Sequence, residues 1–224
     1  MNDRLARNLD SVRARLSESA MRAGRSEADV CLVAVTKGRG VEEISSLYEM
    51  GHRDFGENRA QELAMKAPEL PHDITWHFIG PLQTNKVRLV RPVVAFLHSL
   101  DRMDLARAWT KGPGAPPPAF LQVNIGREPQ KHGFDPADTA NAFRQLIGMG
   151  VSVVGLTAIP PIAASGDESR PYFRRLAELS AQVRQINPDS KGLSMGMTDD
   201  FEVAIEEGAT FIRVGRAIFD PTGN

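Results

Sequence analysis

Apolar and polar residues along the chain follow two alternating patterns. From about Asp3 to Met21, apolar residues recur every third or fourth position, which predicts an amphipathic helix. Cys31–Val35 is a short, continuously apolar run, typical of a strand buried on both faces of a parallel sheet. Val41–Met50 returns to helical spacing, and Gly51 is a suitable helix end.

The same alternation repeats to the end of the sequence. Further strands are expected at Arg53–Phe55, Thr75–Ile79, Val94–His98, Phe120–Ile125, Val153–Ile159, Gly192–Met195 and Phe211–Val214. Further helices are expected at Asn58–Lys66, Thr84–Val90, Met103–Trp109, Pro136–Ile147, Pro171–Ile186 and Asp199–Glu207. Asp135 and Thr198 are candidate caps for two of these helices, because each directly precedes a predicted helix start.

Eight strands separated by helices predict an α/β fold with a parallel sheet closed into a single-domain (β/α)8 TIM-type barrel that spans residues 1–224. An open doubly wound sheet is the alternative. The sequence ends shortly after the eighth strand, so no eighth following helix is expected, and the N-terminal helix is expected to fill that gap. The Gly- and Pro-rich stretch 112–118 is interpreted as a surface loop.

Composition and charge narrow the range of partners. The formal net charge of −1 gives no electrostatic basis for binding nucleic acid or an anionic membrane. No apolar run is long enough to span a bilayer. Cys31 is the single cysteine, so an intrachain disulfide is excluded, and a reducing cytoplasmic location with a buried, inert thiol is expected.

Active sites of such barrels lie at the carboxyl ends of the strands. Lys37, just after the predicted strand Cys31–Val35, is therefore the strongest candidate for a functional residue. A lysine at the rim of an apolar barrel would be desolvated, and desolvation favours the neutral amine that forms imines. A lysine that simply extends into water is the plainer interpretation. From position alone, the plainer interpretation is slightly favoured.

The loops after the last two strands form a second candidate feature. Residues 194–198 (Ser-Met-Gly-Met-Thr) and the Gly215-Arg216 turn are rich in small and hydroxyl-bearing residues, which suit an anion site in this fold. Tight turns would also explain the glycines. Together with Lys37, however, these loops indicate a phosphorylated carbonyl compound as ligand.

A metal site is not expected, because the histidines are scattered without ligand spacing. His77, between Trp76 and Phe78 in a predicted strand, is interpreted as a structural histidine.

Several longer motifs resemble one known family. They are residues 34–37 (AVTK), 55–58 (FGEN), 76–86 (WHFIGPLQTNK), 98–101 (HSLD), 122–125 (QVNI), 193–197 (LSMGM) and Val214-Gly215. In this order they are similar to the pyridoxal phosphate homeostasis proteins, relatives of the barrel domain of alanine racemase. The resemblance covers nearly the whole chain.

The resemblance implies that pyridoxal 5'-phosphate is the cofactor and that Lys37 holds it as a Schiff base. It further implies phosphate binding by Ser194, Thr198, Gly215 and Arg216, contact of Arg213 with the pyridine nitrogen, and a place for Asn58 beside the ring. The chain departs from the family at Gly38-Arg39-Gly40, where relatives often carry a second lysine and a proline. Further departures are Thr198 in place of serine, His132 in place of a small residue, and the absence of a glycine after Phe219.

The family is associated with cofactor homeostasis, and the residues favour a carrier or buffer over an enzyme. An arginine at the ring nitrogen cannot accept its proton, which predicts a weak electron sink. A racemase needs a second base, and the two tyrosines, Tyr48 and Tyr172, are poor candidates by position. A weak racemase-like enzyme and a cofactor-free Schiff-base aldolase are the alternatives. We further expect a monomer, transient contact with apo enzymes that use the cofactor, and a lid in the Pro160–Arg170 loop.

Overall fold

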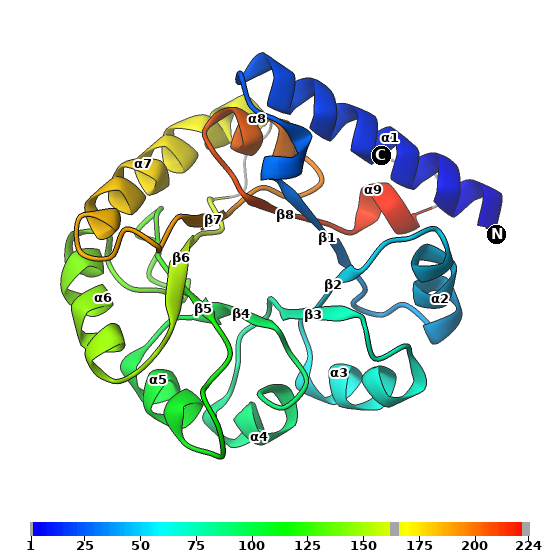
Figure 1. Cartoon of the computed structure of the whole chain (residues 1–224). Coiled ribbons are helices and arrows are strands. Elements are labelled where there is room, and N and C mark those ends of the chain that lie inside the picture. Colours follow the sequence, from blue (N-terminus) through cyan, green and yellow to red (C-terminus); the bar gives the residue numbers. More distant parts are fainter. Residues whose placement is uncertain (1, 162–165, 221–224) are drawn as a thin grey trace.

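The computed structural model describes residues 2–161 and 166–220. Its eight strands form a closed barrel in which every neighbouring pair is parallel and follows the order of the sequence (Figure 1). The strands are β1 (Cys31–Val35), β2 (Asp54–Glu57), β3 (Thr75–Phe78), β4 (Phe96–Leu100), β5 (Ala119–Gln122), β6 (Val153–Thr157), β7 (Gly192–Ser194) and β8 (Phe211–Val214).

Strands β1 and β8 close the barrel, with Cys31 in register with Phe211 and Ala34 with Val214. This pairing confirms the predicted (β/α)8 barrel and excludes the open sheet. Because both faces of each strand are covered, by the barrel interior and by the helices, the strands are apolar and mostly buried, as the continuous apolar runs predicted.

The helices surround the barrel (Figure 1). They are α1 (Asn2–Arg22), α2 (Val41–Glu49), α3 (Ala60–Lys66), α4 (Val87–Val90), α5 (Met103–Thr110), α6 (Thr139–Gly148), α7 (Gly166–Arg184), α8 (Phe201–Glu206) and α9 (Arg216–Phe219). Single 3-10 turns lie at Glu27–Asp29, Ala67–Glu69, Thr84–Lys86 and Pro136–Asp138. Within the described residues, no helix is long and apolar enough to cross a membrane.

Helix α1 packs against α8 and α9, which confirms that the N-terminal helix covers the end of the ring. Its apolar stripe is buried: Leu5, Leu9, Val12, Leu16 and Ala20 are each at most 5% exposed. Truncating one of these leucines to alanine would cost about 2–5 kcal/mol through lost burial and a residual cavity. The Arg4 guanidinium also donates to the Phe219 carbonyl at 2.7 Å.

Three expectations about helices need correction or refinement. A one-turn helix, α9, does follow the eighth strand, contrary to the prediction that none would. Helix α7 begins at Gly166 and not at Pro171, because the acidic residues Asp167 and Glu168 suit a first helical turn. Residues 162–165 of the expected lid lie outside the described residues, and the segment from Gly166 to Arg170 is helical.

The two predicted helix caps have different outcomes. The Asp135 carboxylate accepts a hydrogen bond from the Ala137 N–H at 2.8 Å, which confirms this cap. Thr198 does not cap a helix, because α8 begins only at Phe201. Asp200 takes that position, and its carboxylate accepts from the Met197 N–H at 2.7 Å, which closes the loop after β7.

Candidate functional site

A cavity of about 420 Å³ opens at the carboxyl ends of the strands. Its walls come from segments that follow β1, β2, β3, β6, β7 and β8, which is where barrels of this kind carry their chemistry. The lining residues are Val35, Lys37, Asn58, Ile79, Gly80, Pro81, Ile159, Met197, Thr198, Asp199, Arg213, Gly215 and Arg216.

Lys37 lies in a turn two residues after the end of β1. The residue is exposed, which agrees with the plainer interpretation of a lysine that extends into water and not with a desolvated amine. Within the described part of the chain, its amine has no hydrogen-bond or ion-pair partner and is therefore accessible to a carbonyl compound. Gly38 follows with φ at +70°, a conformation that favours glycine at this departure from the family pattern.

A buried polar network fixes the backbone just before Lys37. Lys66 Nζ lies 2.5 Å from Glu57 Oε1 and donates to the Thr36 carbonyl at 2.9 Å. The Thr36 hydroxyl donates to the same Glu57 oxygen at 2.7 Å. Glu57 and Thr36 are fully buried, so these contacts hold the end of β1 against β2 and α3. Lys66 was not predicted as part of the site, although the carboxylate of Glu57 inside a buried strand required a cationic or donor partner.

Arg213 enters the cavity from the middle of β8 and is nearly inaccessible to solvent. Its guanidinium donates to Ser194 Oγ at 2.5 Å and to the Ala158 carbonyl at 3.2 Å. Burial lowers the pKa of Arg213 to about 10, and the nearby charge of Asp200 acts in the opposite direction. The group remains a cation at neutral pH and presents donors only.

Ser194 lies beneath the cavity and does not line it. It is fully buried, and its hydroxyl is occupied by Arg213 and by His98 Nδ1 at 2.8 Å. The structure therefore brings together Lys37, Asn58, Thr198, Arg213, Gly215 and Arg216, while Ser194 contacts the group from below through Arg213.

The loops after β7 and β8 present backbone donors to the cavity. Among the described residues, the N–H groups of Thr198, Asp199, Arg216 and Ala217 make no backbone hydrogen bond. Gly196 allows the first loop to pack closely: its φ is +91°, and a Cβ there would lie 2.6 Å from the Ala204 Cβ. Unpaired N–H groups of this kind suit an anion.

Asn58 and Gly80 form the wall next to Lys37. The Asn58 Oδ1 atom is buried and has no hydrogen-bond partner in the described residues, although such an atom is costly to leave unpaired. A Cβ at Gly80 would lie 2.2 Å from the Asn58 carbonyl oxygen, so only glycine permits this packing. A polar ligand could satisfy the Asn58 acceptor.

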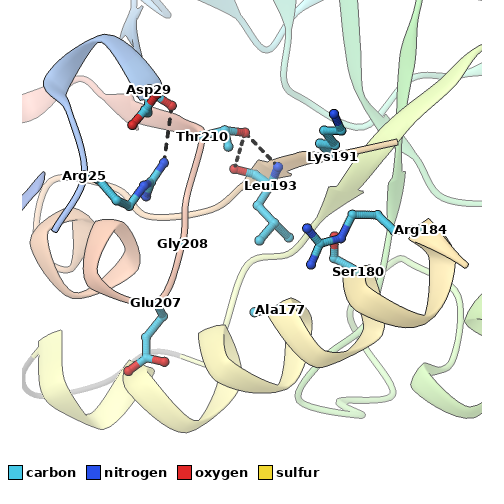
Figure 2. A pocket seen from close by; sticks show the side chains of 10 residues that line it. All are labelled: Arg25, Asp29, Ala177, Ser180, Arg184, Lys191, Leu193, Glu207, Gly208 and Thr210. Carbon is cyan, nitrogen blue, oxygen red and sulfur yellow. Dashed lines mark hydrogen bonds between the residues drawn. The ribbon is translucent and has the colours of Figure 1, made fainter. Parts of the chain in front are cut away.

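A second cavity, of about 500 Å³, lies at the opposite end of the barrel (Figure 2). Its walls include Lys191 and Thr210, which directly precede β7 and β8. Arg25 in this cavity already donates to the Asp29 carbonyl, at 3.3 Å. Because the amino-terminal end of such barrels usually serves stability, we do not assign the function to this cavity.

His77 is a structural histidine, as predicted: it is buried and bonded to His98 and to Asp54. Cys31, Asp54 and His77 bring one sulfur, one oxygen and one nitrogen atom within 4.8 Å of one another. Within this group, His77 Nε2 lies 3.1 Å from Asp54 Oδ1. Burial raises the pKa of the half-buried Cys31 thiol, with Asp54 adding to the effect, which favours the inert form expected from the sequence.

Comparison with known sequences places the chain in a family. The model of the family described as alanine racemase, N-terminal domain, matches residues 3–222. A pyridoxal phosphate homeostasis protein from Aquifex aeolicus is 40% identical over 225 residues, which cover 97% of this chain and 96% of the relative. A protein of the same name from Escherichia coli K12 is 37% identical and covers 98% of this chain and 97% of the relative.

Solved structures agree with this placement. PipY of Synechococcus elongatus with pyridoxal phosphate bound is 35% identical, has a TM-score of 0.80, and covers 96% of this chain and 99% of its own. Alanine racemase from Corynebacterium glutamicum shares the fold, with a TM-score of 0.70 at 14% identity over 94% of this chain and 61% of that enzyme. The chain therefore belongs to the alanine racemase N-terminal domain family and, within it, groups with the pyridoxal phosphate homeostasis proteins.

Proposed function

We propose that this protein binds pyridoxal 5'-phosphate in the cavity at the carboxyl ends of its strands and serves as a carrier or buffer of the cofactor. The observation that carries the proposal is the convergence of Lys37, Arg213 and the donor-rich loops after β7 and β8 on one cavity. The chain shares this fold, over nearly its full length, with a relative whose solved structure contains the cofactor.

The residues present fit the cofactor. The exposed Lys37 amine can form a Schiff base with an aldehyde. The N–H groups of Thr198, Asp199, Arg216 and Ala217, which make no backbone hydrogen bond within residues 2–161 and 166–220, can hold a phosphate. Thr198 lines the cavity and can add its hydroxyl, and the Arg216 guanidinium, which is paired with Asp199, lines it as well. Asn58 carries an acceptor that has no partner among the described residues and that a bound cofactor could satisfy. We include Ser194 in the site because it accepts a hydrogen bond from Arg213, and we do not assign it a direct contact with the phosphate.

Arg213 favours carrying the cofactor over catalysis. In enzymes that use this cofactor, a protonated ring nitrogen lets the ring withdraw electrons from a carbanion. The Arg213 guanidinium donates hydrogen bonds, as it does to Ser194, and cannot accept a proton, so beside the ring nitrogen of a bound cofactor it would leave that nitrogen as an acceptor. The electron sink would then be weak.

The cavity also lacks a tyrosine base among its lining residues. Tyr48 bonds Asp73 at 2.6 Å elsewhere on the molecule, and Tyr172 packs against the core from α7. Asp199 lines the cavity but is paired with the Arg216 guanidinium. A weak racemase-like activity is therefore the second candidate, and a cofactor-free Schiff-base aldolase that uses Lys37 is the third.

We further place this protein in the cytoplasm as a monomer that meets apo enzymes only transiently. The single cysteine and the near-neutral charge support this placement.

The test is to mix the purified protein with pyridoxal 5'-phosphate, record the visible absorbance, reduce with borohydride and map the modified peptide. We expect a Schiff-base band and one modified site at Lys37. No band, or modification spread over surface lysines, would contradict the proposal and favour the aldolase. Rapid exchange of the α-proton of an amino acid in deuterated water would favour the racemase-like enzyme over the carrier.

A further inference from the structure

A chain of hydrogen bonds crosses the barrel interior from its amino-terminal end to the cavity. It runs from Asp54 in β2 through His77 in β3, His98 in β4 and Ser194 in β7 to Arg213 in β8. The successive distances are 3.1 Å from Asp54 Oδ1 to His77 Nε2, 2.9 Å from His77 Nδ1 to His98 Nε2, 2.8 Å from His98 Nδ1 to Ser194 Oγ, and 2.5 Å from Arg213 Nη1 to Ser194 Oγ.

The lower end of the chain fixes the direction of its hydrogen bonds. An ionised Asp54 can only accept, so His77 must carry its proton on Nε2. With one proton per ring, His77 Nδ1 is then an acceptor, and His98 must donate to it from Nε2. His98 Nδ1 becomes an acceptor in turn, and the Ser194 hydroxyl donates to it.

The upper end imposes the same direction independently. Arg213 has no acceptor, so its N–H must point at the Ser194 oxygen. If His98 also donated to that oxygen, the Ser194 hydroxyl proton would have no acceptor among the groups bonded to it. The proton of Ser194 therefore goes to His98, and each bond in the chain donates from Arg213 towards Asp54.

The surroundings exclude solvent from the middle of the hydrogen-bonded chain and hold its two rings, whereas the Asp54 side chain at its end is 34% exposed. His77 and Ser194 are fully buried, and His98 is 3% exposed. The His77 ring is stacked on Phe96 with an interplanar angle of 10°, and the His98 ring is stacked on Phe120 with their centroids 4.4 Å apart. Burial, as the largest cause, together with the charge of Arg213, holds the pKa of His98 well below its usual value, so this ring stays neutral.

We propose that Asp54, at the end of the barrel opposite the cavity, is a positioning residue for Arg213. By fixing the protonated nitrogen of His77, it sets that of His98 and presents the Ser194 oxygen to the guanidinium as an acceptor. The series of hydrogen bonds thus holds Arg213 in place within the cavity and links it to the Asp54 carboxylate, which Arg213 does not contact. The consequence for cofactor binding rests on the proposed function; the chain itself does not.

The groups around Asp54 are compatible with this role. His52 bonds the Asp54 backbone carbonyl at 2.9 Å and leaves the carboxylate to His77 and to the nearby Cys31 thiol. At the Arg213 end of the hydrogen-bonded chain, the charge of Asp200 raises the pKa of Arg213, but the two residues make no ion pair within the described residues. The bond to Ser194, at 2.5 Å, is shorter than the bonds of the guanidinium to the Ala158 carbonyl, at 3.2 Å, and to the Thr157 hydroxyl, at 3.4 Å.

The direct test is nitrogen-15 NMR of the imidazole rings in the cofactor-free protein, which has five histidines. We expect His77 and His98 both to be neutral with the proton on Nε2. A proton on Nδ1 of His98 would overturn the proposal. This measurement needs no variant, so misfolding cannot obscure it.

The coupling is tested with Asp54→Asn, because an amide can donate as well as accept and no longer imposes one direction on His77. We expect the ring nitrogen shifts of His98 to change, although His98 does not contact residue 54, and the Kd for pyridoxal 5'-phosphate to rise about fivefold or more. The matched control is Asp73→Asn, which removes a carboxylate bonded to Tyr48 and Arg53, outside the chain.

The outcomes separate the two proposals. His98 shifts that are the same in Asp54→Asn as in Asp73→Asn would contradict the coupling, and so would an unchanged Kd. If the wild-type protein bound no pyridoxal 5'-phosphate while its rings showed the expected protonation, the proposed function would fail and the hydrogen-bonded chain would stand.

Discussion

Ser194 Oγ accepts a hydrogen bond from Arg213 Nη1 at 2.5 Å, and both side chains are almost completely buried. The contact changes the role expected for Ser194, since a hydroxyl occupied by Arg213 and His98 has little capacity left for a phosphate oxygen. We therefore expect recognition of a phosphate to depend on the loop backbone, Thr198 and Arg216.

Because the loops are expected to hold the phosphate while Ser194 acts through Arg213, substitutions at Thr198 and Ser194 should affect pyridoxal 5'-phosphate and pyridoxal differently. Thr198→Val should weaken binding of pyridoxal 5'-phosphate more than that of pyridoxal, because only the former offers a phosphate. Ser194→Ala should weaken both to a similar degree, because it affects Arg213 and the ring position. Binding of both ligands, measured by absorbance titration, checks the prediction. A larger loss of phosphate preference in Ser194→Ala than in Thr198→Val would restore the direct phosphate role of Ser194.

Lys37→Ala should remove the visible Schiff-base band and the borohydride-stable modification. The control is Lys191→Ala, which changes an exposed lysine at the opposite end of the barrel and should leave both signals unchanged. Absorbance and the mass of the reduced protein measure the effect. Full modification of Lys37→Ala would show that another amine reacts.

The buried pair of Glu57 and Lys66 should matter for stability. Lys66→Met leaves a fully buried carboxylate without its cation and should lower the free energy of unfolding by about 3–5 kcal/mol. The double variant Glu57→Gln with Lys66→Met should recover part of this loss, because no charge is then left unpaired. Urea denaturation measures both. A double variant less stable than Lys66→Met would contradict this explanation.

Acid should destabilise the protein through its buried histidines. Burial lowers the pKa of His98 and, with partial opposition from Asp54, that of His52. Below the unfolded pKa of about 6.5, the unfolded chain binds protons that the folded protein excludes, so stability falls as pH falls, by at most about 1.4 kcal/mol per pH unit for each ring.

The variant His98→Asn should reduce this pH dependence, whereas His72→Asn, which changes an exposed ring, should not. Urea midpoints at pH 7.5, 6.5 and 5.5 give the slopes. Equal slopes for wild type and His98→Asn would show that another group causes the acid sensitivity.

The barrel could be predicted from the sequence because its strands are short apolar runs. The predicted bounds of two of them, Cys31–Val35 and Phe211–Val214, match the structure to the residue. Lys37 and the loops after β7 and β8 followed from the rule that chemistry lies at the carboxyl ends of strands. The exposure of Lys37 agrees with the plainer interpretation of its position. The inward position of Ser194 could not be predicted, because it depends on how the side chain is directed once the loops are packed. The contact of Lys66 with Glu57 likewise joins a helix to a strand and has no local sequence pattern.

Because β1 pairs with β8, with Cys31 in register with Phe211, the barrel can close only after the last strand has been synthesised. Lys37 follows the first strand and Arg213 lies in the last, so the two halves of the cavity leave the ribosome far apart in time. A nascent chain that lacks β8 has the reactive amine and the loop after β7, but it lacks Arg213 and the Gly215-Arg216 turn, which complete the cavity. Stable capture of the cofactor is therefore confined to chains in which the barrel has closed.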